Sequence, residues 1–229
     1  MYTLSGVTKT YTKHGGTIAA VQDASLSIAD GEWVAIHGRT GSGKSTLLQL
    51  LGAMLRPDHG VLSFQDRDLA SVPETELTHV RAAEIGFVFQ AFNLIPTLSA
   101  VENVEAALVP QRVPPAQMRA RAALALDSVG LADRAHHLPS ELSGGQQQRV
   151  GIARALVKQP KVLLADEPTG NLDVDTRDEI MSLLETLWRE RGLTLVLVTH
   201  DSNIAGRAQR VAAMKDGRLS IALAPEEHS

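Results

Sequence analysis

Short apolar runs along the chain predict the strands of a largely buried sheet. The runs at 85–89, 162–165 and 193–199 are almost continuously apolar, which is typical of parallel strands that are covered on both faces. Asp30-Gly31 and Asp216-Gly217 predict hairpin turns between more mixed segments. The predicted strands are Tyr2–Val7, Ala24–Ile28, Glu32–His37, Ile85–Phe89, Val162–Ala165, Leu193–Thr199, Val211–Met214 and Leu219–Leu223.

Apolar residues recur at helical spacing in other segments and predict helices there. The first helix follows a Gly-rich stretch at 38–46, includes Met54 and Leu55, and is stopped by Pro57 and Gly60. Pro114-Pro115 and Gly130 bound the first of the later helices, and the second is stopped before Pro160. These later helices are predicted at Ala116–Val129, Gln146–Val157 and Val174–Glu190.

The order of these elements predicts an α/β fold in a single domain. Residues 91–160 are rich in Ala, Gln and Arg and contain predicted helices but no predicted strand. We therefore expect a helical insertion at about 91–160 within an α/β core made of about 1–90 and 161–229. The helix Val174–Glu190 lies between two apolar strands, as in a βαβ unit, and Pro225–Ser229 is predicted to be a solvated tail.

Composition narrows the classes of protein that fit. The chain has 229 residues, 22 Lys plus Arg, 26 Asp plus Glu and a formal net charge of -4, which argues against a bulk nucleic-acid binder. It contains no Cys, which excludes disulfides, Cys-based metal sites and thiol catalysis. No apolar run approaches the roughly 18–20 residues that span a bilayer, and no secretory signal is evident, so we expect a soluble chain.

A Gly-rich motif between a predicted strand and a predicted helix carries the clearest chemistry. It fits the pattern GxxxxGK[ST], in which glycines let backbone N–H groups curl around phosphate oxygens. The following helix start favours anions, Lys44 reaches the β- and γ-phosphates, and Ser45 ligates Mg²⁺. The predicted phosphate-binding residues are Gly38, Arg39, Thr40, Gly41, Ser42, Gly43, Lys44, Ser45 and Thr46.

Polar side chains follow three of the buried strands directly. Asp166 and Glu167 end the strand at 162–165, Gln90 follows the strand at 85–89, and His200 follows the strand at 193–199. Because ligands gather beyond the carboxyl ends of parallel strands, we expect Asp166 to hold Mg²⁺ and Glu167 to polarise the attacking water. Gln90 is expected to reach Mg²⁺ or the water. His200 contacts the γ-phosphate in this interpretation, although a lone His there is also compatible with a structural role.

A second glycine motif, Leu142–Arg149, lies on the predicted helical insertion. Its residues Ser143, Gly144, Gly145 and Gln146 offer a hydroxyl and N–H groups at a helix start, which suits either an N-cap or an anion site. The motif lies more than 90 residues beyond Lys44 on a different part of the fold. A second copy of the chain is therefore one way to bring it to the nucleotide.

Taken together, these motifs resemble those of the ATP-binding cassette ATPases of ABC transporters. The phosphate loop, Gln90, the Leu-Ser-Gly-Gly-Gln signature, Asp166-Glu167-Pro168 and His200 occur in the order and spacing of that family. The stretches Phe87–Leu98 and Asp166–Asp173 are similar to the macrolide-export, lipoprotein-releasing and cell-division subfamily. The resemblance covers essentially the whole chain. It implies a P-loop NTPase (RecA-like) core with an N-terminal antiparallel β subdomain and an inserted α-helical subdomain.

The resemblance also implies roles for individual residues. Tyr11 would stack on the adenine ring, although a packed aromatic at a strand end is an alternative interpretation. Lys44, Gln90, Glu167 and His200 would serve catalysis, with Ser45, Gln90 and Asp166 around Mg²⁺. The signature residues Ser143 to Gln146 would close over the nucleotide of the partner chain. Asp173 would link the two ATP sites across a head-to-tail homodimer.

Partners and location follow from the same resemblance. The cassette would power an integral-membrane permease with a large extracytoplasmic domain, which would dock near Ala91–Thr97. It would work at the cytoplasmic face of the bacterial inner membrane and export a lipoprotein, a lipid or a macrolide-like compound. One departure is Arg39-Thr40, where the subfamily usually has Pro-Ser. We expect nucleotide binding to survive this change, because the glycines, Lys44 and Ser45 are intact.

Other functions are compatible with parts of this pattern. The ATPase pair could signal mechanically across the membrane to a cell-wall hydrolase and transport nothing. A soluble DNA-repair or translation ATPase of the same superfamily normally carries a long coiled-coil insertion or two cassettes, and this chain has one phosphate loop and no sustained heptad run. A small-molecule kinase would use the phosphate loop but would leave Leu142–Arg149 and His200 unexplained.

Overall fold

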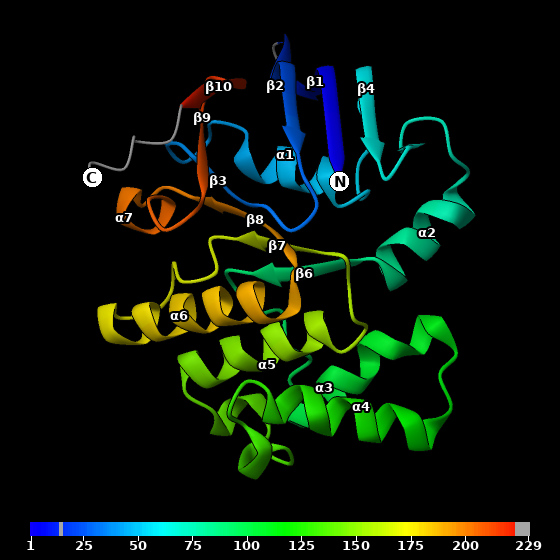
Figure 1. Ribbon diagram of the computed structural model, residues 1–229, viewed down its shortest axis with the longest axis vertical. Coiled ribbons are helices and arrows are strands. Elements are labelled where there is room, and N and C mark those ends of the chain that lie inside the picture. Colours follow the sequence, from blue (N-terminus) through cyan, green and yellow to red (C-terminus); the bar gives the residue numbers. More distant parts are fainter. Residues whose placement is uncertain (14–15, 223–229) are drawn as a thin grey trace. The chain divides into compact units, whose positions relative to one another are not determined.

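The computed structural model describes residues 1–13 and 16–222, which fold into two compact units (Figure 1). The first unit comprises Met1–Thr78 and Thr194–Ser229, and the second comprises His79–Leu193. The helix α2 (Glu74–Ala83) contains residues of both. The domain boundaries that the sequence predicts, near residues 90 and 160, remain a prediction.

The first unit contains a four-stranded sheet in the order β2-β1-β4-β5. Its pairs β1–β2, β1–β4 and β4–β5 are antiparallel, and β1, β2 and β4 lie side by side in Figure 1. Buried residues alternate with exposed ones along the end of β2, where Ala24, Leu26 and Ile28 face the core. The strands are β1 (Tyr2–Lys13), β2 (Gly16–Ile28), β4 (His59–Phe64) and β5 (Arg67–Asp68).

The first unit also contributes the strands β10-β9-β3-β8 of a second sheet. The strand β3 pairs in parallel with both β8 and β9, whereas β9 and β10 form an antiparallel hairpin. The strand β8 is buried along its whole length, as the continuous apolar run predicts. The elements are β3 (Trp33–His37), α1 (Lys44–Leu51), β8 (Thr194–Thr199), α7 (Ser202–Ala205), β9 (Arg210–Lys215) and β10 (Arg218–Ala222).

Two predictions about the N-terminal part are wrong. Asp30-Gly31 forms a turn, with Gly31 at a φ of 74°, but it does not join a hairpin, because β2 and β3 belong to different sheets. The strand β3 is almost fully buried and pairs in parallel with β8 and β9 instead. The helix α1 ends at Leu51 and not near Pro57, since Gly52 caps it. Met54 lies beyond the helix and is 45% exposed.

The second unit combines two parallel strands with helices. The strands β6 and β7 pair in parallel from Ile85↔Val162 to Phe89↔Asp166. The stretch from 100 to 156 contains helices and 3₁₀ turns and no strand. Elements of this unit are β6 (Ile85–Phe89), α3 (Ala100–Glu105), η1 (Ala106–Gln111), α4 (Pro115–Asp127), η2 (Ala132–Arg134), η3 (Pro139–Glu141), α5 (Gly144–Leu156), β7 (Val162–Asp166) and α6 (Val174–Arg191).

Most of the predicted elements are confirmed with shifts of one or two residues at their ends. The helix predicted to end at Gly130 and the C-terminal hairpin across Asp216-Gly217 are both present. Leu223 and the predicted tail Pro225–Ser229 lie outside the described residues. Over 1–13 and 16–222, no helix has both the length and the apolar composition required to cross a bilayer.

A carboxylate ties the first strand to the segment before β4. Asp58 accepts hydrogen bonds from Lys9 Nζ at 2.7 Å, from the Thr10 backbone N–H at 2.8 Å and from Thr10 Oγ1 at 2.8 Å. The Lys9 hydrogen bond first, and then the two bonds from Thr10, lower the pKa of Asp58 from 3.8 to about 2. Because the folded-state pKa is depressed, the carboxylate stabilises the fold above the unfolded-state pKa and loses this effect as the pH falls towards 2.

We therefore expect the effect of Asp58→Asn to depend on pH. The variant should have a lower free energy of unfolding than the parent at pH 6, and the difference should narrow as the pH falls below about 4. Urea unfolding at several pH values measures this, with Asp133→Asn as a control, because the Asp133 side chain is 72% exposed. A deficit that is the same at pH 6 and at pH 3 would contradict the account.

Candidate nucleotide-binding site

The Gly-rich loop connects β3 to α1 and wraps around the end of the Lys44 side chain. Lys44 is 5% exposed, and its Nζ donates hydrogen bonds to the carbonyl oxygens of Gly38 at 2.7 Å and Arg39 at 3.1 Å. The helix α1 begins at Lys44, so its first N–H groups border the loop. Ser42 Oγ is buried and has no hydrogen-bond partner in the described chain. This buried hydroxyl suits a loop that encloses an additional polar ligand.

Two of the loop glycines are required by close backbone contacts. A Cβ on Gly38 would lie 2.2 Å from the carbonyl oxygen of Met214 in β9. A Cβ on Gly43 would lie 2.0 Å from the carbonyl oxygen of Ala20 in β2, and Gly43 has a φ of 103°. No side chain fits at either position without moving a strand. By contrast, a Cβ on Gly41 would meet nothing within 4 Å, so the loop is open on that side.

His200 lies at the same sheet edge as the loop. His37 of β3 is in register with Thr199 of β8, and the Gly38 N–H donates to the Thr199 carbonyl at 3.2 Å. His200 follows Thr199 and is exposed. The His37 ring approaches the His200 carbonyl through Nε2 at 3.2 Å. The parallel pairing of β3 and β8 thus brings the loop and His200 together, as the strand pattern predicts.

Tyr11 lies near the end of β1, opposite Ile18 of β2. Its side chain is 37% exposed. A ring with this exposure is accessible to a stacking partner.

In the second unit, three of the predicted residues lie at the ends of β6 and β7. Phe89 is in register with Asp166, so Gln90 and Glu167 follow at the same edge. Gln90 is held by Asn171, whose Nδ2 donates to the Gln90 carbonyl at 3.0 Å while the Gln90 Nε2 donates to Asn171 Oδ1 at 3.2 Å. Glu167 has a φ of 45°, an uncommon backbone conformation for a non-Gly residue. Such strain is often found at functional positions.

The signature motif forms the start of α5. Ser143 is the N-cap, its Oγ accepts the Gln146 N–H at 3.3 Å, and Gln146 Oε1 accepts the Ser143 N–H at 2.9 Å, which makes a capping box. A Cβ on Gly145 would lie 2.4 Å from Thr176 Cγ2, so α5 and α6 pack closely here. A Cβ on Gly144 would meet Leu172 at 3.3 Å. The motif therefore has a structural function within the chain as well as exposed polar groups.

Asp173 caps α6 and points to the same packing site. Its carboxylate accepts the Thr176 N–H at 3.0 Å and the Thr176 Oγ1–H at 2.8 Å. These hydrogen bonds, the backbone one first, lower the pKa of Asp173 below its usual value of 3.8. Asp173 is therefore ionised at neutral pH, and Thr176 is fixed in one rotamer against Gly145.

Gln148 is a buried residue that sequence reasoning missed. It is 0% exposed, and its Nε2 donates to the Pro168 carbonyl at 2.5 Å, so it ties α5 to the loop that follows Glu167. Its Oε1 has no partner among the described residues. The sequence signal for its burial was the position of this polar side chain on a helix, between the buried positions Gly145 and Ile152.

The donor set can be tested against the predicted Mg²⁺. Ser45, Gln90 and Asp166 offer a hydroxyl, an amide oxygen and a carboxylate, and Mg²⁺ prefers oxygen ligands with several positions left for water and phosphate. No group of three or more His, Cys, Asp or Glu side chains in the described parts of the chain forms a separate metal cage. The three donor types therefore fit Mg²⁺.

The strand, loop and helix arrangement defines a protein of the P-loop nucleotide-binding class. Comparisons with known proteins narrow this class. The family described as "ABC transporter" matches residues 21–170. The uncharacterized ABC transporter ATP-binding protein YvrO of Bacillus subtilis is 42% identical over 221 residues, which cover 96% of this chain and 96% of YvrO. The chain belongs to the ABC transporter family.

Other relatives are longer. The macrolide export ATP-binding/permease protein MacB of Sodalis glossinidius is 46% identical over 216 residues, which are 94% of this chain and 33% of MacB. The chain thus spans about a third of the length of such relatives. Among solved structures, the ATP-binding cassette MJ0796 in a dimeric, post-hydrolysis state with ADP and Pi has a TM-score of 0.90 and 43% identity. That match covers 98% of this chain and 99% of that one. The predicted P-loop NTPase fold is confirmed.

The close packing of Gly145 on Thr176 generates a double-variant prediction. Gly145→Ala should destabilise the chain by about 1–2 kcal/mol despite the better helix propensity of Ala, because the hydrogen bonds to Asp173 prevent Thr176 from turning away. Thr176→Ser removes the clashing Cγ2 and keeps the hydroxyl. In the Thr176→Ser background, Gly145→Ala should be neutral or stabilising in urea unfolding. An equal loss of stability in both backgrounds would show that this contact is not the cause.

Proposed function

We propose that this chain is an ATP-binding and ATP-hydrolysing subunit that powers a membrane permease. The observation that carries the proposal is the phosphate loop. Its buried Lys44, its two glycines against neighbouring strands and the start of α1 form an anion site next to His200. Membership of the ABC transporter family supports ATP as the ligand of this loop.

ATP would bind with its phosphates along the loop from Gly38 to Thr46. In the structure, Lys44 Nζ donates to two loop carbonyls, and it would exchange at least one of them for a phosphate oxygen. The N–H groups at the start of α1 would donate to the same phosphates. The exposed ring of Tyr11 would stack on the adenine. Arg39 would add a positive charge beside the phosphates, at a position where the subfamily usually has Pro. Thr40 stands where the subfamily usually has Ser, and the loop glycines are unchanged.

Ser45, Gln90 and Asp166 would hold Mg²⁺, with Asp166 acting through water. When bound, Mg²⁺ neutralises charge on the triphosphate and positions its oxygens. Gln90 suits this role because Asn171 holds its backbone and side chain in one conformation.

Glu167 would be the general base that activates the attacking water, and His200 would contact the γ-phosphate. Glu167 directly follows the strand β7. Its backbone conformation, with a φ of 45°, sets the direction in which the carboxylate leaves the chain, and a general base must be placed within hydrogen-bond distance of the water. Lys44 would stabilise the charge that develops on the transferred phosphoryl group.

Two copies would bind two ATP molecules head to tail. Ser143, Gly144, Gly145 and Gln146 of one copy would close over the nucleotide held by the loop of the other, and Asp173 would connect the two sites. The dimeric structure of MJ0796 with ADP and Pi supports a dimer of this chain, because that protein matches over nearly all of both chains. ATP would favour the closed pair, and hydrolysis would reopen it.

The membrane partner would be a permease with a large extracytoplasmic domain, bound near Ala91–Thr97 at the cytoplasmic face of the bacterial inner membrane. Two relatives with permease parts are named for export, MacB for macrolides and PvdT of Pseudomonas entomophila, 48% identical over 202 residues, for pyoverdine. These names favour export of a lipoprotein, a lipid or a macrolide-like compound over signalling to a cell-wall hydrolase.

Glu167→Gln tests the assignment of the base. The variant should bind ATP as the parent does but hydrolyse it at least about 100-fold more slowly, because the amide does not accept the proton of the attacking water. It should also accumulate as an ATP-bound dimer in size-exclusion chromatography with multi-angle light scattering. Glu190→Gln, on the exposed end of α6, is the matched control and should hydrolyse ATP at the parent rate. Hydrolysis by Glu167→Gln at the parent rate would refute the role.

Ile95→Glu tests the proposed partner surface. Ile95 is 44% exposed, so a charge there should leave folding and ATP binding intact while it weakens an apolar contact with the permease. Affinity purification from membranes, with mass spectrometry, should recover a permease with the parent chain and much less of it with Ile95→Glu. Val61→Glu, at a position 49% exposed on β4, should recover parent amounts. Equal recovery with all three chains would place the docking surface elsewhere.

A further inference from the structure

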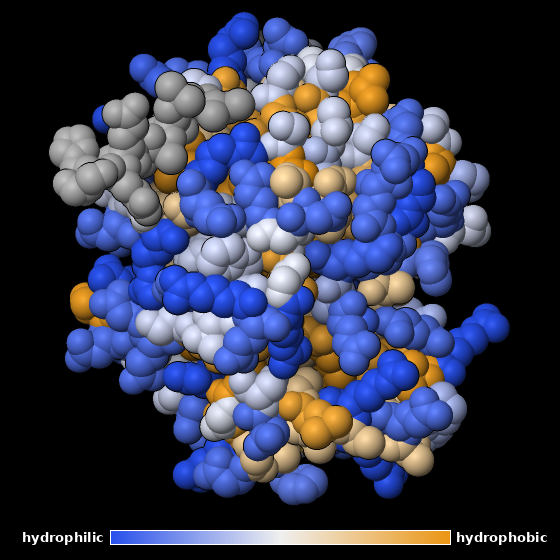
Figure 2. Space-filling model, viewed as in Figure 1, coloured by the Kyte–Doolittle hydropathy of each residue, from blue (hydrophilic) through white to orange (hydrophobic). Residues whose placement is uncertain are grey.

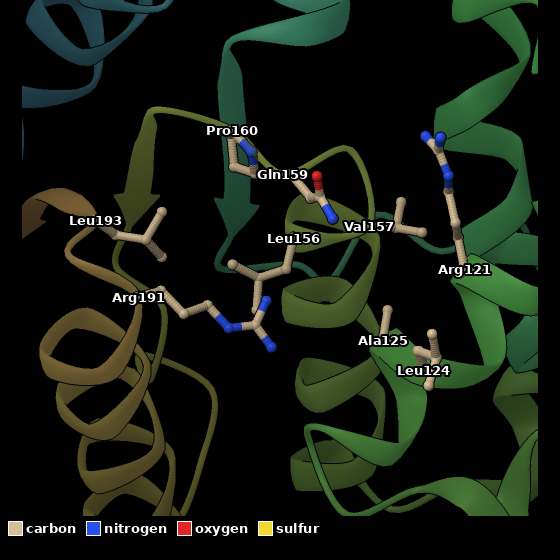
Figure 3. A pocket seen from close by; sticks show the side chains of 9 residues that line it. All are labelled: Arg121, Leu124, Ala125, Leu156, Val157, Gln159, Pro160, Arg191 and Leu193. Carbon is tan, nitrogen blue, oxygen red and sulfur yellow. The ribbon is translucent and has the colours of Figure 1, made fainter.

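A groove of about 530 Å³ opens in the second unit, among the ends of three helices (Figure 3). This volume is within the range of about 300–1,000 Å³ that is typical of small-molecule sites. None of its residues belongs to the proposed ATP site. The groove is lined by Arg121, Leu124, Ala125, Leu156, Val157, Gln159, Pro160, Arg191 and Leu193.

The charged residues of this lining are both arginines. Arg121 belongs to α4 and Arg191 to the last turn of α6. Both are exposed, and neither guanidinium group makes a hydrogen bond or an ion pair with any other residue that the structure describes. In Figure 3 the Arg191 guanidinium extends towards Leu156, and Arg121 lies beyond Val157. Two unpartnered guanidinium groups and no lining carboxylate make the groove selective for anions.

Apart from Gln159, the surface between the arginines is apolar. Leu156 and Val157 at the end of α5 and Leu193 after α6 are buried and form the floor. Leu124 is 70% exposed at the rim, and Figure 2 shows a group of hydrophobic side chains over the region of α4. When a ligand covers such an exposed aliphatic side chain, apolar surface is removed from water, and this favours binding of the ligand.

We propose that this groove binds an amphipathic anion, that is, a carboxylate at the end of a hydrocarbon chain. The carboxylate pairs with the guanidinium group of Arg191 or of Arg121, which lie on opposite sides of the apolar floor, and the chain lies over this floor and against Leu124. Charge alone would suit any small anion, and the floor alone would suit any hydrocarbon. The combination selects a molecule that carries both.

The proposal goes beyond the ATPase and does not depend on it. The helix α5 joins the two features within one unit, since its 13 residues run from Gly144 of the signature motif to Leu156 of the groove floor. Because the proposal is independent of the ATPase, binding of the anion is measured on the full chain without nucleotide. If the groove does not bind the anion, the proposed ATPase activity still stands. If the chain does not hydrolyse ATP, the proposed anion site still stands.

Sodium dodecanoate, below its micellar concentration, is the probe, and isothermal titration calorimetry measures its affinity. We expect one site per chain. Octanoate should bind at least about tenfold more weakly, because each buried methylene contributes about fourfold. Dodecan-1-ol, with the same chain and no charge, should also bind at least about tenfold more weakly. Methyl NMR shifts should fall on Leu124, Leu156, Val157 and Leu193.

Variants separate this groove from general adsorption. Arg121→Gln combined with Arg191→Gln should lower dodecanoate affinity about tenfold, and Leu124→Glu should do the same by repulsion at the rim. Each position is exposed, so the variants should keep the parent melting temperature, which is checked first. Arg119→Gln on α4 is the matched control, because Arg119 does not line the groove.

The proposal is overturned if dodecanoate and dodecan-1-ol bind equally, or if Arg119→Gln weakens binding as much as the paired substitution. It is also overturned if the methyl shifts lie outside the groove. Absence of dodecanoate binding together with self-association of the chain that Leu124→Glu abolishes would assign the surface to a second copy instead.

Discussion

The close approach of two glycines to neighbouring strands is the constraint on which the phosphate loop depends. Gly38 lies against the Met214 carbonyl of β9, and Gly43 lies against the Ala20 carbonyl of β2, at distances that leave no space for a Cβ. The loop is thereby held between two sheets, and α1 must begin at Lys44. The Lys44 ammonium then points back into the loop and has loop carbonyls as partners. In the proposed function, a phosphate oxygen of ATP would replace at least one of these carbonyls as a partner of Lys44.

In the second unit, side-chain hydrogen bonds organise the remaining residues. Gln148 ties α5 to the Pro168 carbonyl, and Asn171 holds Gln90, so the segment around Asp166 and Glu167 is fixed from two sides. Asp173 and Thr176 fix the start of α6 against Gly145 of the signature motif. The signature therefore begins a helix whose packing is coupled to the loop after β7.

Sequence patterns predicted the buried strands well, for physical reasons. A strand covered on both faces must be continuously apolar, so β7 and β8 are visible in the sequence, and the polar residues at their ends predict the site. Sequence patterns gave the wrong prediction where pairing between strands that are distant in the sequence determines the structure. Asp30-Gly31 has hairpin chemistry, yet β3 pairs with β8 and β9, because its residues are too apolar for a half-exposed hairpin. The role of Gln148 was also hidden, since a single glutamine has no periodic signal.

The central claim is that each ATP site is completed by a second copy of the chain. Two inactive variants test it directly: Lys44→Ala, which disables the phosphate loop, and Ser143→Arg, which blocks the signature. If sites are shared, a mixed dimer retains one intact site, and mixing the variants should restore up to about a quarter of the parent ATPase rate. If each chain instead hydrolyses ATP with its own loop and its own signature, the mixture will remain as inactive as its two components, and the account is wrong.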